Sequence, residues 1–332
     1  MSAIDATPRE LARRVREGDR GAVARALNLV DDRRSAQRSE ALDLLDALEP
    51  PPHGRRIGIT GAPGAGKSTL LDALASALRA RGRSVGILAV DPSSRRTGGA
   101  LLGDRFRMGA STRDAGVFFR SLAAREELGG LSEVAGASLD VLAAAFDVVF
   151  IETVGVGQSE ASIADFVETL VFVAQPAAGD LLQFMKAGIL EWPDVFFVNK
   201  SDLEALAART ATELRAGLEL GRGHDGDARA VVLSGSARDG IGIDALIDAI
   251  DAHHARLEQT GELARRRGAG RVVRVESALA RRYGRFGLAR LGEREPLARF
   301  VAAHPDASAE RLIDMLGARF EAGWDAARAE RS

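Results

Sequence analysis

Gly61-Ala62-Pro63-Gly64-Ala65-Gly66-Lys67-Ser68 is the stretch of sequence that decides the fold. It matches the phosphate-binding pattern G-x-x-x-x-G-K-[ST] at every fixed position. The apolar residues 57–60 predict a strand before it and residues 68–81 a helix after it, as the pattern requires. Glycines let such a loop turn tightly and point backbone N–H groups at an anion in front of a helix N-terminus. The alternative is a glycine-rich turn that binds nothing.

Lysine occurs at only three positions, Lys67, Lys186 and Lys200, against 42 arginines. Lysine is a compact point charge and arginine a wide planar fork, so we expect a lysine to persist where a guanidinium would fail. Lys67 is expected to reach the β- and γ-phosphates of a nucleotide, with Ser68 as a ligand of Mg²⁺. The residues expected to bind the nucleotide here are Gly61, Ala62, Pro63, Gly64, Ala65, Gly66, Lys67, Ser68 and Thr69.

The composition is that of an ordinary globular protein. Of 332 residues, 46% are hydrophobic and 28% charged, and the formal net charge is −2. A net charge this close to zero gives no overall electrostatic attraction to nucleic acid or to a membrane surface. Cysteine is absent, which excludes disulfides, thiolate metal sites and cysteine nucleophiles. Apolar runs of at most about eight residues are too short to span a bilayer, and residues 3–20 are polar, so we expect a cytoplasmic protein.

Short apolar runs alternate with helix-length segments from residue 56 onward. Strands are expected at residues 56–60, 85–90, 117–120, 148–152, 169–174, 195–199 and 230–234, and helices at 67–81, 133–145, 203–220 and 243–257. This alternation predicts an α/β fold with a doubly wound, mainly parallel sheet. We divide the chain into an N-terminal helical segment (1–52), a nucleotide-binding domain (53–258) and a C-terminal helical extension (259–332), the last with turns near residues 268–270, 292 and 304–305.

A second motif, Asn199-Lys200-Ser201-Asp202, follows the apolar run 195–198 and has the guanine-reading pattern N-K-x-D. The Asp202 carboxylate would accept hydrogen bonds from guanine N1–H and the 2-amino group, two donors that adenine lacks. Lys200 would lay its stem along the base. The alternative is a helix cap formed by Asp202. The backbone of Ser236, Ala237 and Arg238, just after the strand at 230–234, is expected to complete the pocket.

Acidic residues near the ends of predicted strands are candidate metal ligands. We expect Ser68, Asp91, Asp104 and Glu152 to hold Mg²⁺ and its waters, because parallel strands end beside the P-loop. The alternative for each carboxylate is a helix cap or a surface ion pair. Gln158 is a candidate for orienting the attacking water. The candidate catalytic residues are therefore Lys67, Glu152 and Gln158.

These motifs, in this order, closely resemble the MeaB/MMAA-type GTPases associated with methylmalonyl-CoA mutase, also called ArgK-like. Besides the P-loop and N-K-x-D, the resemblance rests on Asp91-Pro92-Ser93-Ser94, Arg96-Thr97-Gly98-Gly99 and ETVGVGQSE at 152–160, and it covers residues 55–257. It implies a P-loop protein of the SIMIBI class, a homodimer that binds GTP or GDP with Mg²⁺. It also implies an adenosylcobalamin-dependent acyl-CoA mutase as partner, with a cobalamin adenosyltransferase as a further expected partner.

In such a protein, nucleotide state would gate cofactor loading and protect or reactivate the mutase. Hydrolysis of GTP to GDP and phosphate should be slow, since the sequence offers no clear arginine finger or catalytic base. Residues 176–191 are similar to the third switch of the family and contain Asp180, Gln183 and Lys186. Lys186 would signal nucleotide state to the partner; the alternative is an exposed helical lysine.

The resemblance weakens after residue 258, where the family has a helical dimerisation arm. Residues 265–290 hold nine arginines and a single acid, Glu276. This segment is either a surface for a partner or a second copy, or an amphipathic helix with a solvated basic face.

Two other functions remain open at this point. An ArgK-like protein kinase or transport ATPase is disfavoured by N-K-x-D. A metallochaperone GTPase for nickel would need Cys and His ligands, whereas the chain has no Cys and its adjacent pair His253-His254 is expected at an exposed helix end.

Overall fold

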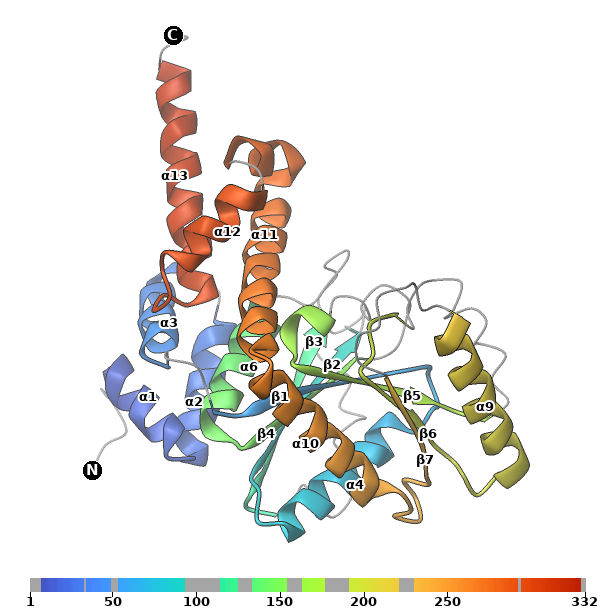
Figure 1. Cartoon of the computed structure of the whole chain (residues 1–332). Helices are drawn as coiled ribbons and strands as arrows, with labels where there is room; N and C mark the ends of the chain where they lie inside the picture. Colours follow the sequence, from blue (N-terminus) through green and yellow to red (C-terminus); the bar gives the residue numbers. More distant parts are fainter. Residues whose placement is uncertain are drawn as a thin grey trace.

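A seven-stranded sheet organises the chain (Figure 1). The computed structural model describes residues 7–32, 34–48, 53–92, 114–124, 133–153, 163–176, 191–220, 230–291 and 294–329. The strands are β1 (Arg55–Thr60), β2 (Val85–Pro92), β3 (Val117–Ala124), β4 (Val148–Thr153), β5 (Thr169–Ala174), β6 (Val195–Val198) and β7 (Val231–Ser234). They lie in the order β3-β2-β4-β1-β5-β6-β7, and each adjacent pair is parallel. The predicted fold class and all seven predicted strands are confirmed.

The position of β1 decides where the functional site lies. β1 pairs with β4 on one side and β5 on the other, with Ile59 opposite both Glu152 and Val171. All six residues of β5 are buried, as expected for a parallel strand that is covered on both faces. The loop after β1 therefore starts at the centre of the sheet's carboxyl edge, where nucleotides bind in doubly wound folds.

Helices cover both faces of the sheet. On one face, α4 (Lys67–Ala80) and α10 (Ile243–Gln259) share a core with Ile57, Phe150 and Val173. On the other face lie α6 (Glu133–Ala145), beside β2 and β4, and α9 (Glu204–Leu220), beside β5 and β6. These four helices confirm the four that the sequence predicts between the strands.

Three helices precede the sheet: α1 (Pro8–Arg16), α2 (Arg20–Asp31) and α3 (Ser35–Leu48). Local capping sets two of their starts. The Thr7 hydroxyl accepts from Glu10 N at 3.3 Å, and the Asp19 carboxylate accepts from Gly21 N and Ala22 N at 2.9 and 3.0 Å. Their apolar faces share one hydrophobic core with α6, so this segment packs directly on the sheet layer.

The chain ends in α11 (Glu262–Leu291), α12 (Arg294–Ala302) and α13 (Ala309–Ala329), which rise away from the sheet (Figure 1). They have a core of their own, which includes Val275, Leu279 and Leu312. We call these three helices the arm. None of the described helices is long and apolar enough to cross a membrane.

The turn predicted at residues 268–270 is wrong, because α11 runs through them as continuous helix. A Cβ atom at Gly270 would lie 2.2 Å from the backbone oxygen of Asp165, next to the 3-10 helix η2 (Ala164–Phe166). Glycine here serves close packing of α11 on η2 rather than a turn. The helix bends instead at Gly284, whose φ is 69°. The turn predicted near 304–305 is present, and residue 292 lies outside the described residues.

Candidate functional site

The P-loop forms the tight turn that its glycines predict. Gly61 and Gly66 have φ values of 138° and 91°, which favour glycine. A Cβ atom at Gly61 would lie 2.2 Å from Val173 O, and one at Gly66 would lie 2.4 Å from Asn199 Nδ2. Both positions therefore exclude a side chain for reasons of space as well as of backbone conformation.

Lys67, the first residue of α4, is buried beneath this loop with 7% of its surface exposed. Its Nζ donates to Gly61 O at 2.8 Å and to Ala62 O at 3.1 Å. Both acceptors belong to the P-loop itself, so these bonds hold the ammonium group at the loop in front of the helix N-terminus. This arrangement fits the predicted contact with phosphate.

Ser68 and Glu152 meet beside the loop. Ser68 Oγ lies 3.1 and 3.4 Å from the two carboxylate oxygens of Glu152, at the end of β4. A hydroxyl and a carboxylate are hard oxygen donors of the kind that Mg²⁺ prefers. Within the described ranges, no group of three or more His, Cys, Asp or Glu residues could hold a metal ion.

The other candidates for the metal and the switches are only partly described. Asp91 lies in β2 near the same sheet edge, since Ala89 is opposite Glu152, but its side chain is not described. Asp104, Gln158, Asp180, Gln183 and Lys186 lie outside the described residues.

Asn199 joins three loops at the carboxyl edge of the sheet. Its side chain is buried, with Nδ2 donating to Ala65 O at 2.8 Å and Oδ1 accepting from Ala237 N at 2.9 Å. Lys200 adds a second link, from its Nζ to Gly64 O at 2.9 Å, and its φ of 59° turns the chain sharply there. The P-loop, N-K-x-D and residues 236–238 therefore meet, as predicted.

Arg238 lies over the carboxylate expected to read the base. Its Nη2 is 3.3 Å from Asp202 Oδ2, and its Nε is 3.0 Å from Asp239 Oδ1. The hydrogen bond from Arg238, together with one from the Ser236 hydroxyl at 2.6 Å, lowers the pKa of Asp239. The Arg238 side chain is 71% exposed, so a base could displace it from Asp202 at little cost.

Sequence reasoning missed Gln175, which directly follows β5. Its Oε1 accepts from Lys200 Nζ at 2.9 Å, so it helps to position the lysine of the base motif. Its position in the sequence could have revealed it. Because β5 lies beside both β1 and β6, a polar residue directly after β5 is near the P-loop and near N-K-x-D.

The expectation that His253 and His254 lie at an exposed helix end is wrong. Their side chains are only 9% and 6% exposed, because α10 packs against the sheet there. His253 bridges two side chains, with Nδ1 at 2.9 Å from Thr169 Oγ1 and Nε2 at 3.1 Å from Asp194 Oδ1. His253 thus lies among buried polar groups, whereas His254 pairs with the exposed Glu258 on its own helix at 3.3 Å.

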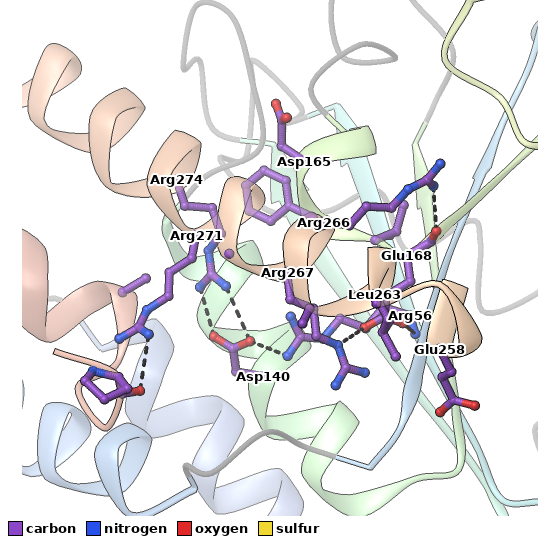
Figure 2. Close-up of a pocket in the computed structure, with 17 residues that line it drawn as sticks. Arg56, Asp140, Asp165, Glu168, Glu258, Leu263, Arg266, Arg267, Arg271 and Arg274 are labelled. Carbon is purple, nitrogen blue, oxygen red and sulfur yellow. Dashed lines mark hydrogen bonds and ion pairs between the residues drawn. The ribbon is translucent and has the colours of Figure 1, made fainter. Parts of the chain in front are cut away.

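Of the two alternatives for residues 265–290, the solvated basic face is wrong for Arg266, Arg267 and Arg274. Arg266 pairs with Asp194 at 2.9 Å, and Arg274 pairs with Glu310 at 2.9 Å. Figure 2 shows two further pairs, Arg267 with Glu168 at 2.7 Å and Arg274 with Asp140 at 2.9 Å. A helix pattern alone does not reveal this, because the partner carboxylates lie outside α11, most of them far away in the sequence. These arginines fix α11 to the sheet.

The central P-loop on a parallel sheet, with N-K-x-D beside it, defines a P-loop protein built to bind a guanine nucleotide. Comparisons with known proteins agree. A sequence model described as "Methylmalonyl Co-A mutase-associated GTPase MeaB" matches residues 23–283. The chain therefore belongs to the MeaB family of GTPases.

Individual proteins are also similar to most of the chain. A Pyrococcus horikoshii protein named as a GTPase is 42% identical over 271 residues, 80% of this chain and 83% of the relative. The mouse mitochondrial "Methylmalonic aciduria type A homolog" is 35% identical over 265 residues, 76% of this chain and 64% of the relative. A crystal structure of "LAO/AO transport system kinase" has a TM-score of 0.70 and 27% identity, covering 97% of this chain and 100% of that one.

Proposed function

We propose that this protein is a slow, Mg²⁺-dependent GTPase that acts as a chaperone of an adenosylcobalamin-dependent acyl-CoA mutase. Its nucleotide state gates cofactor loading and protects or reactivates the mutase. The observation that carries the guanine part is the position of Asn199, hydrogen-bonded to both Ala65 O and Ala237 N. These bonds hold Asp202 beside the P-loop, where one nucleotide can reach both.

Each part of the nucleotide has a proposed partner. Lys67 and the backbone N–H groups of the P-loop bind the β- and γ-phosphates, and Asp202 accepts from guanine N1–H and the 2-amino group. The stem of Lys200, held by Gly64 O and Gln175, lies along the base. Arg238 leaves Asp202 when guanine enters.

Ser68, Glu152, Asp91 and Asp104 are the proposed holders of Mg²⁺. When bound, the ion neutralises charge that develops on the phosphate oxygens. Glu152 has 9% of its surface exposed and is hydrogen-bonded to Ser68, so it is already oriented at this position. Gln158 is the proposed residue for positioning water.

The mutase partner is supported by the family description and by the mouse relative's name. We propose that the arm forms the homodimer contact and that residues 176–191, with Asp180, Gln183 and Lys186, report nucleotide state to the mutase. A cobalamin adenosyltransferase is a further proposed partner.

Affinity capture tests the partner. The protein is immobilised with GDP or with a non-hydrolysable GTP analogue, and bound proteins from its own cells are identified. Recovery of a cobalamin-dependent mutase, in amounts that differ between the two nucleotides, supports the proposal. Failure to recover a mutase in either state contradicts it. With the purified mutase, Lys186→Ala should weaken mutase-stimulated hydrolysis and leave intrinsic nucleotide binding unchanged.

A further inference from the structure

Lys200 has an unusual backbone conformation. Its φ is 59°, and no other residue except glycine has a positive φ in the described part of the chain. Such a conformation is strained for a residue with a side chain and persists only where its surroundings hold it. Hydrogen bonds on both sides do so: Asn199 N donates to Ala174 O and Ser201 N to Gly235 O, both at 2.9 Å. The fold thus fixes the point at which the Lys200 side chain leaves the backbone.

This conformation decides which face of the sheet Lys200 reaches. Along β6, Phe197 packs in the core that includes α4, and Val198 packs in the core that includes α9. Regular alternation would carry Asn199 to the α4 face and Lys200 to the α9 face. The left-handed turn ends this alternation, and Lys200 Nζ instead donates to Gly64 O in the P-loop, just before α4.

Two acceptors hold the Lys200 ammonium group. Its Nζ lies 2.9 Å from Gly64 O and 2.9 Å from Gln175 Oε1. An ammonium group has three donors and no acceptor, so it requires the oxygen of the Gln175 amide rather than its nitrogen. Lys200 is therefore fixed at both ends, by the backbone turn and by these two bonds. A lysine side chain without such bonds would have large conformational freedom to lose on binding a ligand.

Gln175 is itself held firmly enough to position another side chain. It directly follows β5, whose last residue, Ala174, lies opposite Val198 of β6. Ala174 and Pro176, on either side of Gln175, are buried. A residue before proline favours extended backbone, so Gln175 continues the direction of β5. Alternation along the strand then places its side chain with that of Val173, on the face that α4 covers.

A bound base offers two different surfaces, an edge and a face. Asp202 is the proposed reader of the guanine edge, where N1–H and the 2-amino group lie. The stem of Lys200 is proposed to lie along the face, which every purine has. A residue that acts only through Lys200 should therefore change how tightly a base is held without changing which base is chosen.

We propose that Gln175 is a positioning residue of the base site, which fixes Lys200 so that the lysine stem is in place when a nucleotide enters. This role rests on the proposed function, in which a guanine base lies along Lys200. Prior fixation raises affinity because less side-chain freedom is lost on binding. The amide is neutral, so it holds the ammonium group without cancelling its charge, as a carboxylate would.

A double-mutant cycle separates this role from a general effect on the fold. Gln175→Met removes the acceptor and keeps a side chain of similar length. Lys200→Met removes the ammonium group, and a third variant carries both changes. Gln259→Met is the matched control, because Gln259 is exposed at the end of α10 and its side chain makes no hydrogen bond within the described ranges.

Affinities are measured on the full chain, freed of nucleotide and held in Mg²⁺, by competition with a fluorescent GDP analogue. The ligands are GDP, inosine diphosphate, which lacks only the 2-amino group of guanine, and tripolyphosphate, which has no base. We expect Gln175→Met to weaken GDP and inosine diphosphate by the same factor, about tenfold, and to leave tripolyphosphate unchanged. Added to Lys200→Met, it should have no further effect on any ligand. Gln259→Met should match wild type.

Four results would overturn the proposal: unchanged GDP affinity in Gln175→Met, an equal loss for tripolyphosphate, unequal losses for the two nucleoside diphosphates, or a further loss when Gln175→Met is added to Lys200→Met. If Gln175→Met fails to fold, Gln175→Ala takes its place in the cycle. The proposed function fails separately, if wild type does not prefer GDP to ADP. An unchanged Gln175→Met protein beside a wild type with that preference contradicts only the role of Gln175.

Discussion

The two ends of β1 hold their cations in opposite ways. At the carboxyl end, Lys67 and Lys200 donate to backbone oxygens and to the Gln175 amide. At the amino end, Arg56 and the arginines of α11 meet mainly carboxylates, among them Asp140 and Glu168. The described acceptors of Lys200 are neutral and leave its charge available for a ligand, whereas a carboxylate largely satisfies an arginine.

The carboxyl end of β1 is therefore arranged as a ligand site. The amino end holds α11 on the sheet through the ion pairs of Arg56, Arg266, Arg267 and Arg274, and we call this set of ion pairs the joint. The carboxyl end is recognisable from two short motifs, because a few consecutive residues contact the phosphates and a few others contact the base. The arginine end is made by partners far apart in sequence, such as Asp140 and Arg274.

Breaking the joint should have the largest effect. Arg274→Met leaves Asp140 and Glu310 buried without their shared cation, which should lower the free energy of unfolding by about 3–5 kcal/mol in a urea titration. Arg282→Met, on the same helix, removes a half-exposed arginine whose partners lie 3.6 Å away, and should cost less than about 1 kcal/mol. Equal losses of unfolding free energy in the two variants would show that the buried ion pairs of Arg274 stabilise the fold no more than the half-exposed pairs of Arg282.

Breaking the phosphate end should remove activity and leave stability nearly unchanged. Lys67→Ala should lower GTP hydrolysis about 100-fold or more, roughly 3 kcal/mol of transition-state stabilisation. Lys67→Arg should be nearly as inactive, because the planar fork does not fit where a compact ammonium group does. A fully active Lys67→Arg enzyme would contradict our explanation of why lysine is kept at this position. Phosphate release under saturating GTP provides the measurement.

Two glycines of α11 test how closely this helix packs on η2. Gly270→Ala forces a methyl group toward Asp165 O and should destabilise the protein by about 1–3 kcal/mol. Gly268→Ala places the same group in open space and should stabilise α11 by up to about 1 kcal/mol. Urea unfolding of both variants compares them directly. The reverse order of stability would mean that α11 does not pack on η2 as described.

The smallest expected effect is a pH dependence at the joint end. Burial, with a contribution from Arg55, lowers the pKa of His254. The unfolded chain takes up this proton at about pH 6.5 and the folded chain only at lower pH, so stability falls as pH drops below that value. Thermal unfolding should show a weaker fall in His254→Gln, whereas the exposed His53→Gln variant should behave as wild type. An identical pH profile for all three proteins would rule out this role.

The sequence predicts the sheet well, and it indicates which motifs lie at the sheet's carboxyl edge, because these signals are local. Each strand is a short apolar run, and the P-loop and N-K-x-D each occupy consecutive residues whose chemistry is fixed by the ligand. Parallel pairing then brings the strand ends to one edge, so Ser68 and Glu152 meet although 84 residues separate them. Gln175 was missed because a single polar residue after a strand carries no motif.

The ion pairs of the joint could not be predicted, because no motif of neighbouring residues indicates them. A solvated basic face was one of the two alternatives for residues 265–290, yet Arg266, Arg267 and Arg274 pair with carboxylates outside α11. Gly270 was expected to mark a turn, since a glycine used for close packing has the same one-residue signal as a glycine used for its backbone freedom. His253 was misplaced for the same reason, because its partners Thr169 and Asp194 are distant in sequence.

The most direct test of the central claim is the preference for guanine over adenine. GDP and ADP compete with a fluorescent nucleotide for the wild-type protein, for Asp202→Asn and, as a matched control, for Asp239→Asn in the same pocket loop. We predict that wild type and Asp239→Asn prefer GDP by about 100-fold or more and that Asp202→Asn loses most of this preference. Comparable affinities of wild type for GDP and ADP, or an unchanged preference in Asp202→Asn, would contradict the account.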